Sequence, residues 1–157
     1  MEIRGKYTDA DYTRLIGFLD ICNSYGMNIT VVDANGNFIV HFVPTNEMGK
    51  VLPVYEEGYR SYYNYNWNDQ YQLTNFTTAI STDDTTQEER NCLTLEMAAR
   101  GFGFFNRSSR FKDSIFQTDY SGLQQLSDID YFMISTLYGD YIKSGMNEAQ
   151  VEAALGG

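Results

Sequence analysis

The stretch LEMAARGFGFFN, residues 95–106, has the spacing of a zinc-binding catalytic helix without its usual residue types. Such a helix carries two histidine ligands four residues apart, a glutamate between them that activates a water, and a third ligand beyond a glycine. In this chain the positions hold Glu96, Met97, Arg100, Gly103 and Asn106. A carboxylate can bind zinc, but arginine has no free lone pair, methionine accepts no proton and an amide is a poor ligand. We therefore expect no catalytic group here, no metal and no cofactor.

Charge on this helix could take the place of a metal. Glu96 precedes Arg100 by four residues, the favourable order for an ion pair along a helix. We expect the guanidinium to lie about where zinc would sit, facing Glu96 and Asn106. The alternative is an ordinary solvated pair, worth a few tenths of a kcal/mol.

Other catalytic or metal-binding groups are sparse. His41 is the single histidine and is expected to be a partly buried strand residue. Cys22 and Cys92 share no metal-binding spacing, and buried thiols are favoured over a disulfide. A Cys92–His41 nucleophile would need the fold to join the two residues, and the helix position of Cys92 predicts burial. A glycosidase with paired carboxylates stays formally open, although five aspartates are better explained as caps and helix-start charges: Asp83, Asp84, Asp113, Asp128 and Asp130.

Composition limits the class of protein and its partners. The chain has 157 residues, which is most simply one domain over residues 1–157. It has 21 acidic and 11 basic residues, a formal charge of −10, so nucleic acid and anionic lipid surfaces are poor partners. No apolar run is long enough for a membrane span, so we expect no membrane insertion by this domain. No signal peptide begins the sequence, although a removed leader would leave the same pattern.

Helical periodicity and capping residues predict the helices. An apolar stripe within residues 8–25 predicts a helix capped by Thr8. Thr85 or Thr86 can cap a second helix that runs to about Phe102. Ser127 begins a third helix in LSDIDYFMISTLYGDYI, and Asn147 caps a short helix over residues 148–155.

Strand signals are weaker. The pair Asn35-Gly36 favours a tight turn, which predicts a β-hairpin within residues 27–44. Residues 73–82 predict a further strand. Residues 45–72 are irregular and rich in tyrosine, so Tyr63, Tyr65 and Trp67 are candidate ligand-stacking residues. The favoured alternative is a long connection whose rings pack onto the sheet.

Several blocks, in order and spacing, resemble a family of bacterial secreted and lipid-anchored proteins of unknown function with a metzincin-like, or zincin-like, pattern. They are NFIVHFVPTNEM, ISTDDTTQEERNCLTLE, GFGFFNRSSRFKDSIF, LSDIDYFMISTLY and IKSGMNEAQ. The helix of this family typically reads Glu-Glu-x-x-Gln-x-x-Gly-x-x-Asn-Asp, so the chain departs from it at Met97, Arg100 and Arg107. Cys92 stands where relatives often have histidine, and Phe116 where the enzymes place a methionine beneath the metal.

The resemblance implies an α+β fold, with a twisted mixed sheet packed by an N-terminal helix and the Glu96 helix, and a C-terminal helix beyond. It implies an extracellular or cell-envelope protein that is a degenerate metallopeptidase without activity and binds a peptide or glycan. The expected ligand-binding residues are Tyr63, Tyr65, Trp67, Glu96, Arg100 and Asn106. Two alternatives stay open: a hydrolase with unusual chemistry that uses Glu96, and a structural module of a larger envelope protein, whose groove would be filled.

Overall fold

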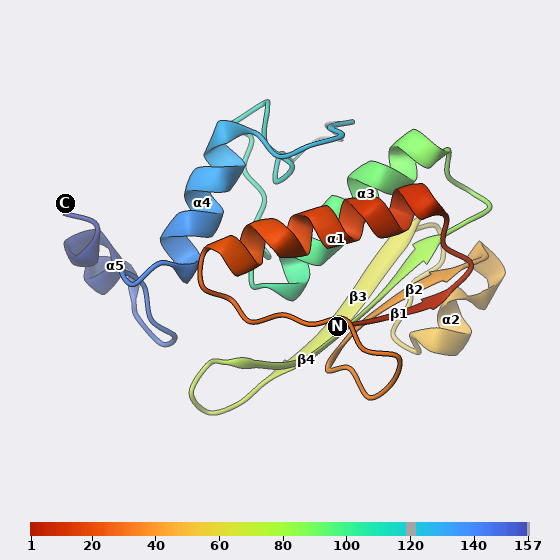
Figure 1. Ribbon diagram of the computed structural model, residues 1–157, viewed down its shortest axis with the longest axis horizontal. Helices are drawn as coiled ribbons and strands as arrows, with labels where there is room; N and C mark the ends of the chain where they lie inside the picture. Colours follow the sequence, from red (N-terminus) through yellow and green to blue (C-terminus); the bar gives the residue numbers. More distant parts are fainter. Residues whose placement is uncertain (119–121, 157) are drawn as a thin grey trace.

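The computed structural model describes residues 1–118 and 122–156 and has the predicted α+β architecture (Figure 1). One mixed sheet has the strand order β1-β2-β4-β3. The elements in chain order are β1 (Glu2–Gly5), α1 (Asp9–Ser24), β2 (Phe38–Val43), the short 3-10 helix η1 (Thr45–Glu47), α2 (Met48–Val51), β3 (Ser61–Trp67), β4 (Leu73–Ser81), α3 (Gln87–Gly101), α4 (Asp128–Tyr138) and α5 (Glu148–Ala154). Within the described ranges, no helix is long and apolar enough to cross a membrane.

The predicted hairpin at Asn35-Gly36 is wrong. Strand β2 runs parallel to β1 and to β4, and residues 27–37 contain no strand. Asn35 does adopt a left-handed φ of 62°. Gly36 lets the chain pass close to β1, because a Cβ at this position would lie 2.7 Å from Cβ of Glu2. The chain therefore does turn at Asn35-Gly36. This turn carries the chain past the start of β1 and does not join two paired antiparallel strands.

The aromatic segment 45–72 contains an edge strand that was not predicted. Residues Ser61–Trp67 form β3, which pairs antiparallel with β4 and with no other strand. The rings do lie on the sheet, because the strand itself belongs to it. The β3–β4 hairpin projects beyond the other strands, on the same side of the molecule as α5 (Figure 1).

Helices α1, α3, α4 and α5 each begin at a predicted cap. Thr8, Ser127 and Asn147 each accept a hydrogen bond from the backbone N–H three residues later, in a reciprocal capping box. Of the two candidates for α3, Thr86 is the cap, because the hydroxyl of Thr85 instead donates to the carbonyl oxygen of Ser81 at 2.7 Å. Helix α4 ends before the predicted Ile142 because Gly139 is extended, with ψ of 179°.

Helices α1 and α3 lie side by side on one face of the sheet (Figure 1). The core beneath them includes Leu15, Phe18, Phe38 and Phe76. Gly101 is required by close packing, because a Cβ there would lie 2.4 Å from the Phe38 ring. A smaller cluster on the other face packs α2 against the sheet through Val43, Met48, Leu52 and Ala79.

The two cysteines are both buried thiols. Burial raises the pKa of Cys22 to about 12, so this sulfur stays protonated at neutral pH. A protonated, buried thiol is a poor nucleophile.

Candidate functional site

Glu96 and Arg100 form the predicted pair, and the pair is buried. Both side chains lie on the sheet-facing side of α3 and are less than a tenth exposed. Nη2 of Arg100 donates to Oε1 of Glu96 at 2.8 Å, and Nε donates to the same oxygen at 3.3 Å. Nη1 of Arg100 donates to the carbonyl oxygen of Phe105 at 2.7 Å. The geometry therefore excludes the solvated-pair alternative.

A second arginine, which the sequence analysis did not place at the site, completes the cluster. Nε of Arg107 donates to Oε1 of Glu96 at 3.0 Å, and its Nη2 also contacts this oxygen. The side chain of Arg107 is 44% exposed. One feature of the sequence could have pointed to Arg107: an arginine replaces the family's acidic residue at the end of the same motif. We call Glu96, Arg100 and Arg107 the glutamate cluster; it contains two cations and one anion.

The other positions of the motif are not brought to this cluster. Met97 is buried in the main core, where it cannot serve as a base. Asn106 is exposed and is not among the described partners of Glu96 or Arg100. Gly103 ends α3 in a left-handed conformation, with φ of 98° and its N–H donating to the Arg100 carbonyl oxygen.

The aromatic residues predicted for ligand binding share one face of β3. Tyr63, Tyr65 and Trp67 alternate along the strand, with ring centroids 6.0 Å and 5.3 Å apart in turn. The Phe105 ring stacks on Tyr65 at 4.4 Å. The Arg100 guanidinium lies 5.2 Å from the centroid of Tyr63, so the row starts at the glutamate cluster. Trp67 at the far end is 59% exposed. We call these three residues the aromatic row.

A groove of about 870 Å³ opens where the aromatic row ends. Its walls come from the β3–β4 hairpin, the loop after α1, the end of α3 and the segment after α4. Trp67 and Phe105 belong both to the aromatic stack and to this groove, whereas Tyr63, Tyr65 and the glutamate cluster lie outside it. This hollow lies past the C-terminal end of α3, the helix that carries Glu96.

The remaining candidates have structural roles. His41 is buried, and burial lowers its pKa, together with the positive charge of Arg4. Phe116, at the family's methionine position, is buried against the Phe104 ring at 5.1 Å. Across the described residues no three His, Cys, Asp or Glu side chains converge as a metal site would require.

The five aspartates divide into helix-start residues and others. Asp128 and Asp130 lie in the first turn of α4, as predicted. Asp83 instead accepts hydrogen bonds from the backbone N–H and hydroxyl of Thr45, and these bonds lower its pKa. Asp84 lies 3.6 Å from Arg60, and Asp113 lies in a loop. The cap interpretation therefore holds only for the α4 pair.

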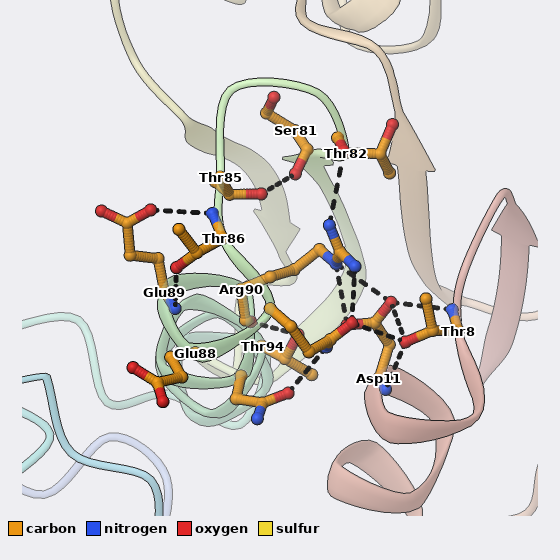
Figure 2. A network of polar contacts seen from close by, with 12 residues as sticks. Thr8, Asp11, Ser81, Thr82, Thr85, Thr86, Glu88, Glu89, Arg90 and Thr94 are labelled. Atoms are coloured by element: carbon orange, nitrogen blue, oxygen red, sulfur yellow. Dashed lines mark hydrogen bonds and ion pairs between the residues drawn. The ribbon is translucent and has the colours of Figure 1, made fainter.

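A second buried ion pair joins α1 to α3 (Figure 2). Asp11 is fully buried, and Nε of Arg90 donates to its two carboxylate oxygens at 2.9 Å and 3.1 Å. The N–H and hydroxyl of Thr8 donate to the same carboxylate. The side-chain amide of Gln87 donates to it at 2.8 Å, and its oxygen accepts from Arg90. Asp11 lies in the first turn of α1, and its partner Arg90 lies 79 residues away in the sequence.

Comparison with known protein families identifies a match over most of the chain. A family model described as "Protein of unknown function (DUF2927)" matches residues 7–156. The matched range includes α1 to α5, the glutamate cluster and the aromatic row. No curated protein and no solved structure matches the chain.

Proposed function

We propose that this chain, which belongs to the DUF2927 family of proteins of unknown function, is a zincin-like binding module without peptidase activity. Its ligand would be a peptide or a glycan held at the aromatic row, and it would work outside the cell or in the envelope. The observation that carries the proposal is that an edge strand whose aromatic row ends in the exposed Trp67 lies beside a glutamate whose Oε1 accepts from two arginines.

The glutamate cluster argues against catalysis by Glu96. A general base or metal ligand must present a free lone pair to water or to a metal. Oε1 of Glu96 already accepts N–H groups from Arg100 and Arg107. A hydrolase that used Glu96 would have to act through its other carboxylate oxygen beside two cations, or separate the pair and leave Arg100 buried without its partner, which would be costly.

The zincin-like part of the proposal rests on the resemblance of the sequence blocks. The arrangement of elements is consistent with it. A mixed sheet has the Glu96 helix α3 packed on one face, and α4 follows in the chain. The bacterial and envelope assignment rests on the same resemblance alone.

The shape and charge of the surface favour a binding module over a purely structural one. A structural module would have a filled surface, whereas about 870 Å³ of groove lies open at Trp67. Pockets of this size are typical of ligand sites. A formal charge of −10 makes nucleic acid a poor ligand.

Binding and hydrolysis assays on the same purified protein test the proposal. We expect the protein to bind to a glycan or peptide array. This binding should weaken in Trp67→Ala and stay unchanged in Phe132→Ala. Phe132 is a suitable control because it is 60% exposed, as Trp67 is 59% exposed, and it lies on α4 away from the row. Peptide hydrolysis that disappears in Glu96→Ala would favour the hydrolase instead. Absence of any binding on both arrays would refute the binding module.

A further inference from the structure

The groove at the end of the aromatic row has an unusual charge composition. Lys143 is the one charged side chain among the 24 described residues that line it, whereas 20% of the chain is charged. Lys143 lies 3.8 Å from Asp140, and the α-ammonium of Met1, which also lines the groove, donates to the Thr30 carbonyl oxygen. The smaller cavity of about 500 Å³ between α1 and α3 includes Asp9 and Arg14 among 12 lining residues, close to the chain average. The depletion of charge is therefore specific to the large groove. It indicates a ligand without charge, because a charged ligand would need a partner once desolvated.

Amide residues form part of the polar lining of the groove, beside the hydroxyl residues Thr30, Thr74 and Ser144. They are Asn28, Asn37, Gln72 and Asn75. Within the described ranges, the exposed side chain of Asn28 makes no hydrogen bond to protein. An amide both donates and accepts, as a sugar hydroxyl does, so the two groups match one another. Exposed rings beside such amides suit the apolar faces of sugar rings.

Tyr71 carries a further sign of ligand binding. It lies in the β3–β4 turn with φ of 58°, a left-handed conformation that is costly for a bulky residue. Its side chain is nevertheless 72% exposed and lines the groove. The ring reaches the segment after α4, since a Cβ at Gly145 would lie 3.5 Å from its Cδ2. Packing does not explain a large exposed ring at a position that favours glycine, and such strain is often kept for function.

We infer that this groove binds a neutral oligosaccharide, with Trp67 and Tyr71 stacking on sugar rings and Asn28 bonding to hydroxyls. The inference rests on the proposed binding function and narrows its ligand to a glycan. A peptide would instead be expected to add along the free edge of β3, which exposes backbone groups. The groove is lined by the ends of β2, β3 and β4 together with loops and helix ends, and not by the length of a free strand edge.

Calorimetric titration with defined hexasaccharides tests this inference. The probes are cellohexaose, chitohexaose and maltohexaose as neutral chains, and hexagalacturonate as an anionic chain. We expect at least one neutral hexamer to bind and hexagalacturonate to bind at least about tenfold more weakly. Tyr71→Gly and Asn28→Ala should each weaken binding of the neutral probe about fivefold to tenfold. Phe132→Ala should bind as the unchanged chain does.

Tyr71→Gly also separates binding from stability, because glycine relieves the left-handed strain. We expect its urea midpoint to be equal or higher while its affinity falls. Tighter binding of hexagalacturonate than of any neutral hexamer would overturn the inference. So would an array in which only peptides bind and Tyr65→Ala abolishes that binding, although the proposed function would then stand. Absence of both glycan and peptide binding would overturn both.

Discussion

Helix α3 carries one buried arginine cluster at each end, and the two clusters differ in charge balance. At its start, one cation meets one anion: Asp11 is fully buried and the Arg90 side chain is 9% exposed. In the glutamate cluster, two cations meet one anion, and Arg107 is 44% exposed. The first cluster ties α1 to α3 and has no free charge (Figure 2). The second leaves a surplus cation, Arg107, half exposed at the surface, while the buried Arg100 lies over the Tyr63 ring.

From this difference we interpret the Asp11–Arg90 cluster as part of the scaffold and the glutamate cluster as part of the site. A buried pair whose every lone pair is used is expensive to open, so it fixes the elements that it joins. A cluster with a surplus, half-exposed charge can respond to a neighbour at lower cost. Because both clusters lie on the same helix, substitutions in one serve as controls for the other.

The largest effect is expected for Arg90→Met. It leaves the fully buried carboxylate of Asp11 without its cation, and breaking such a pair on one side costs about 3–5 kcal/mol of unfolding free energy. Urea unfolding followed by circular dichroism measures the loss. Arg60→Met, which removes a half-exposed partner of Glu89, should cost far less. A loss for Arg90→Met no greater than that of Arg60→Met would show that the first cluster is not the scaffold.

Glu96→Gln should have the next largest effect, about 2–3 kcal/mol, because two guanidinium groups then face a neutral amide. The loss is smaller than for Arg90→Met because Arg100 keeps the Phe105 carbonyl oxygen and Arg107 can turn to water. Unfolding of the Glu96→Gln/Arg107→Met double variant checks the surplus charge. Removing one cation should restore about 1 kcal/mol relative to Glu96→Gln alone. If the changes in unfolding free energy of the two single substitutions simply add in the double variant, the glutamate cluster does not contain a surplus charge.

The sequence predicted the features that depend on local signals. The caps Thr8, Thr86 and Ser127 are each read from three or four adjacent residues, and all three begin helices as expected. Strands β1 and β3 were missed because their formation depends on pairing with distant segments rather than on their own pattern.

The same division applies to the site. Glu96 and Arg100 are four residues apart on one helix, so their pairing follows from helix geometry alone. The contact of Arg107 depends on how the chain turns back after Gly103, and that of Arg90 on the docking of α1. Neither turn nor docking has a periodic signature. The aromatic row was named residue by residue, but the groove at its end is formed by four separate segments and has no local pattern.

Arg107→Ala should cost only about 0–1 kcal/mol, because Glu96 keeps Arg100 and the lost cation is half exposed. The cost should also shrink in 1 M NaCl, where charges at the surface are screened within about 3 Å. Urea unfolding at low and high salt measures both numbers. Arg90→Met is the internal control, since a fully buried pair should lose little of its contribution to salt. A cost above about 2 kcal/mol that salt does not change would place Arg107 with the scaffold cluster instead.

The smallest effect is a loss of stability at acidic pH that comes from His41. It sets the pH range in which variants of the two clusters can be compared. His41 lies opposite Arg4 across β2 and β1, and burial lowers its pKa from 6.5. The unfolded chain therefore binds this proton more readily than the folded one. The free energy of unfolding should be unaffected by His41 above about pH 6.5 and should fall as the pH falls below that value.

His41→Gln isolates this contribution, because every other titrating group is common to both proteins. The difference in unfolding free energy between the two chains should change between pH 6.5 and 5 and be constant above. Carboxyl groups with lowered pKa, such as Glu2 and Asp83, act only below their ordinary values of 4.5 and 3.8. Equal slopes for the two chains below pH 6.5 would show that His41 is not held neutral by the fold. Cluster variants are then best compared at pH 7 to 8, where His41 no longer contributes to the slope.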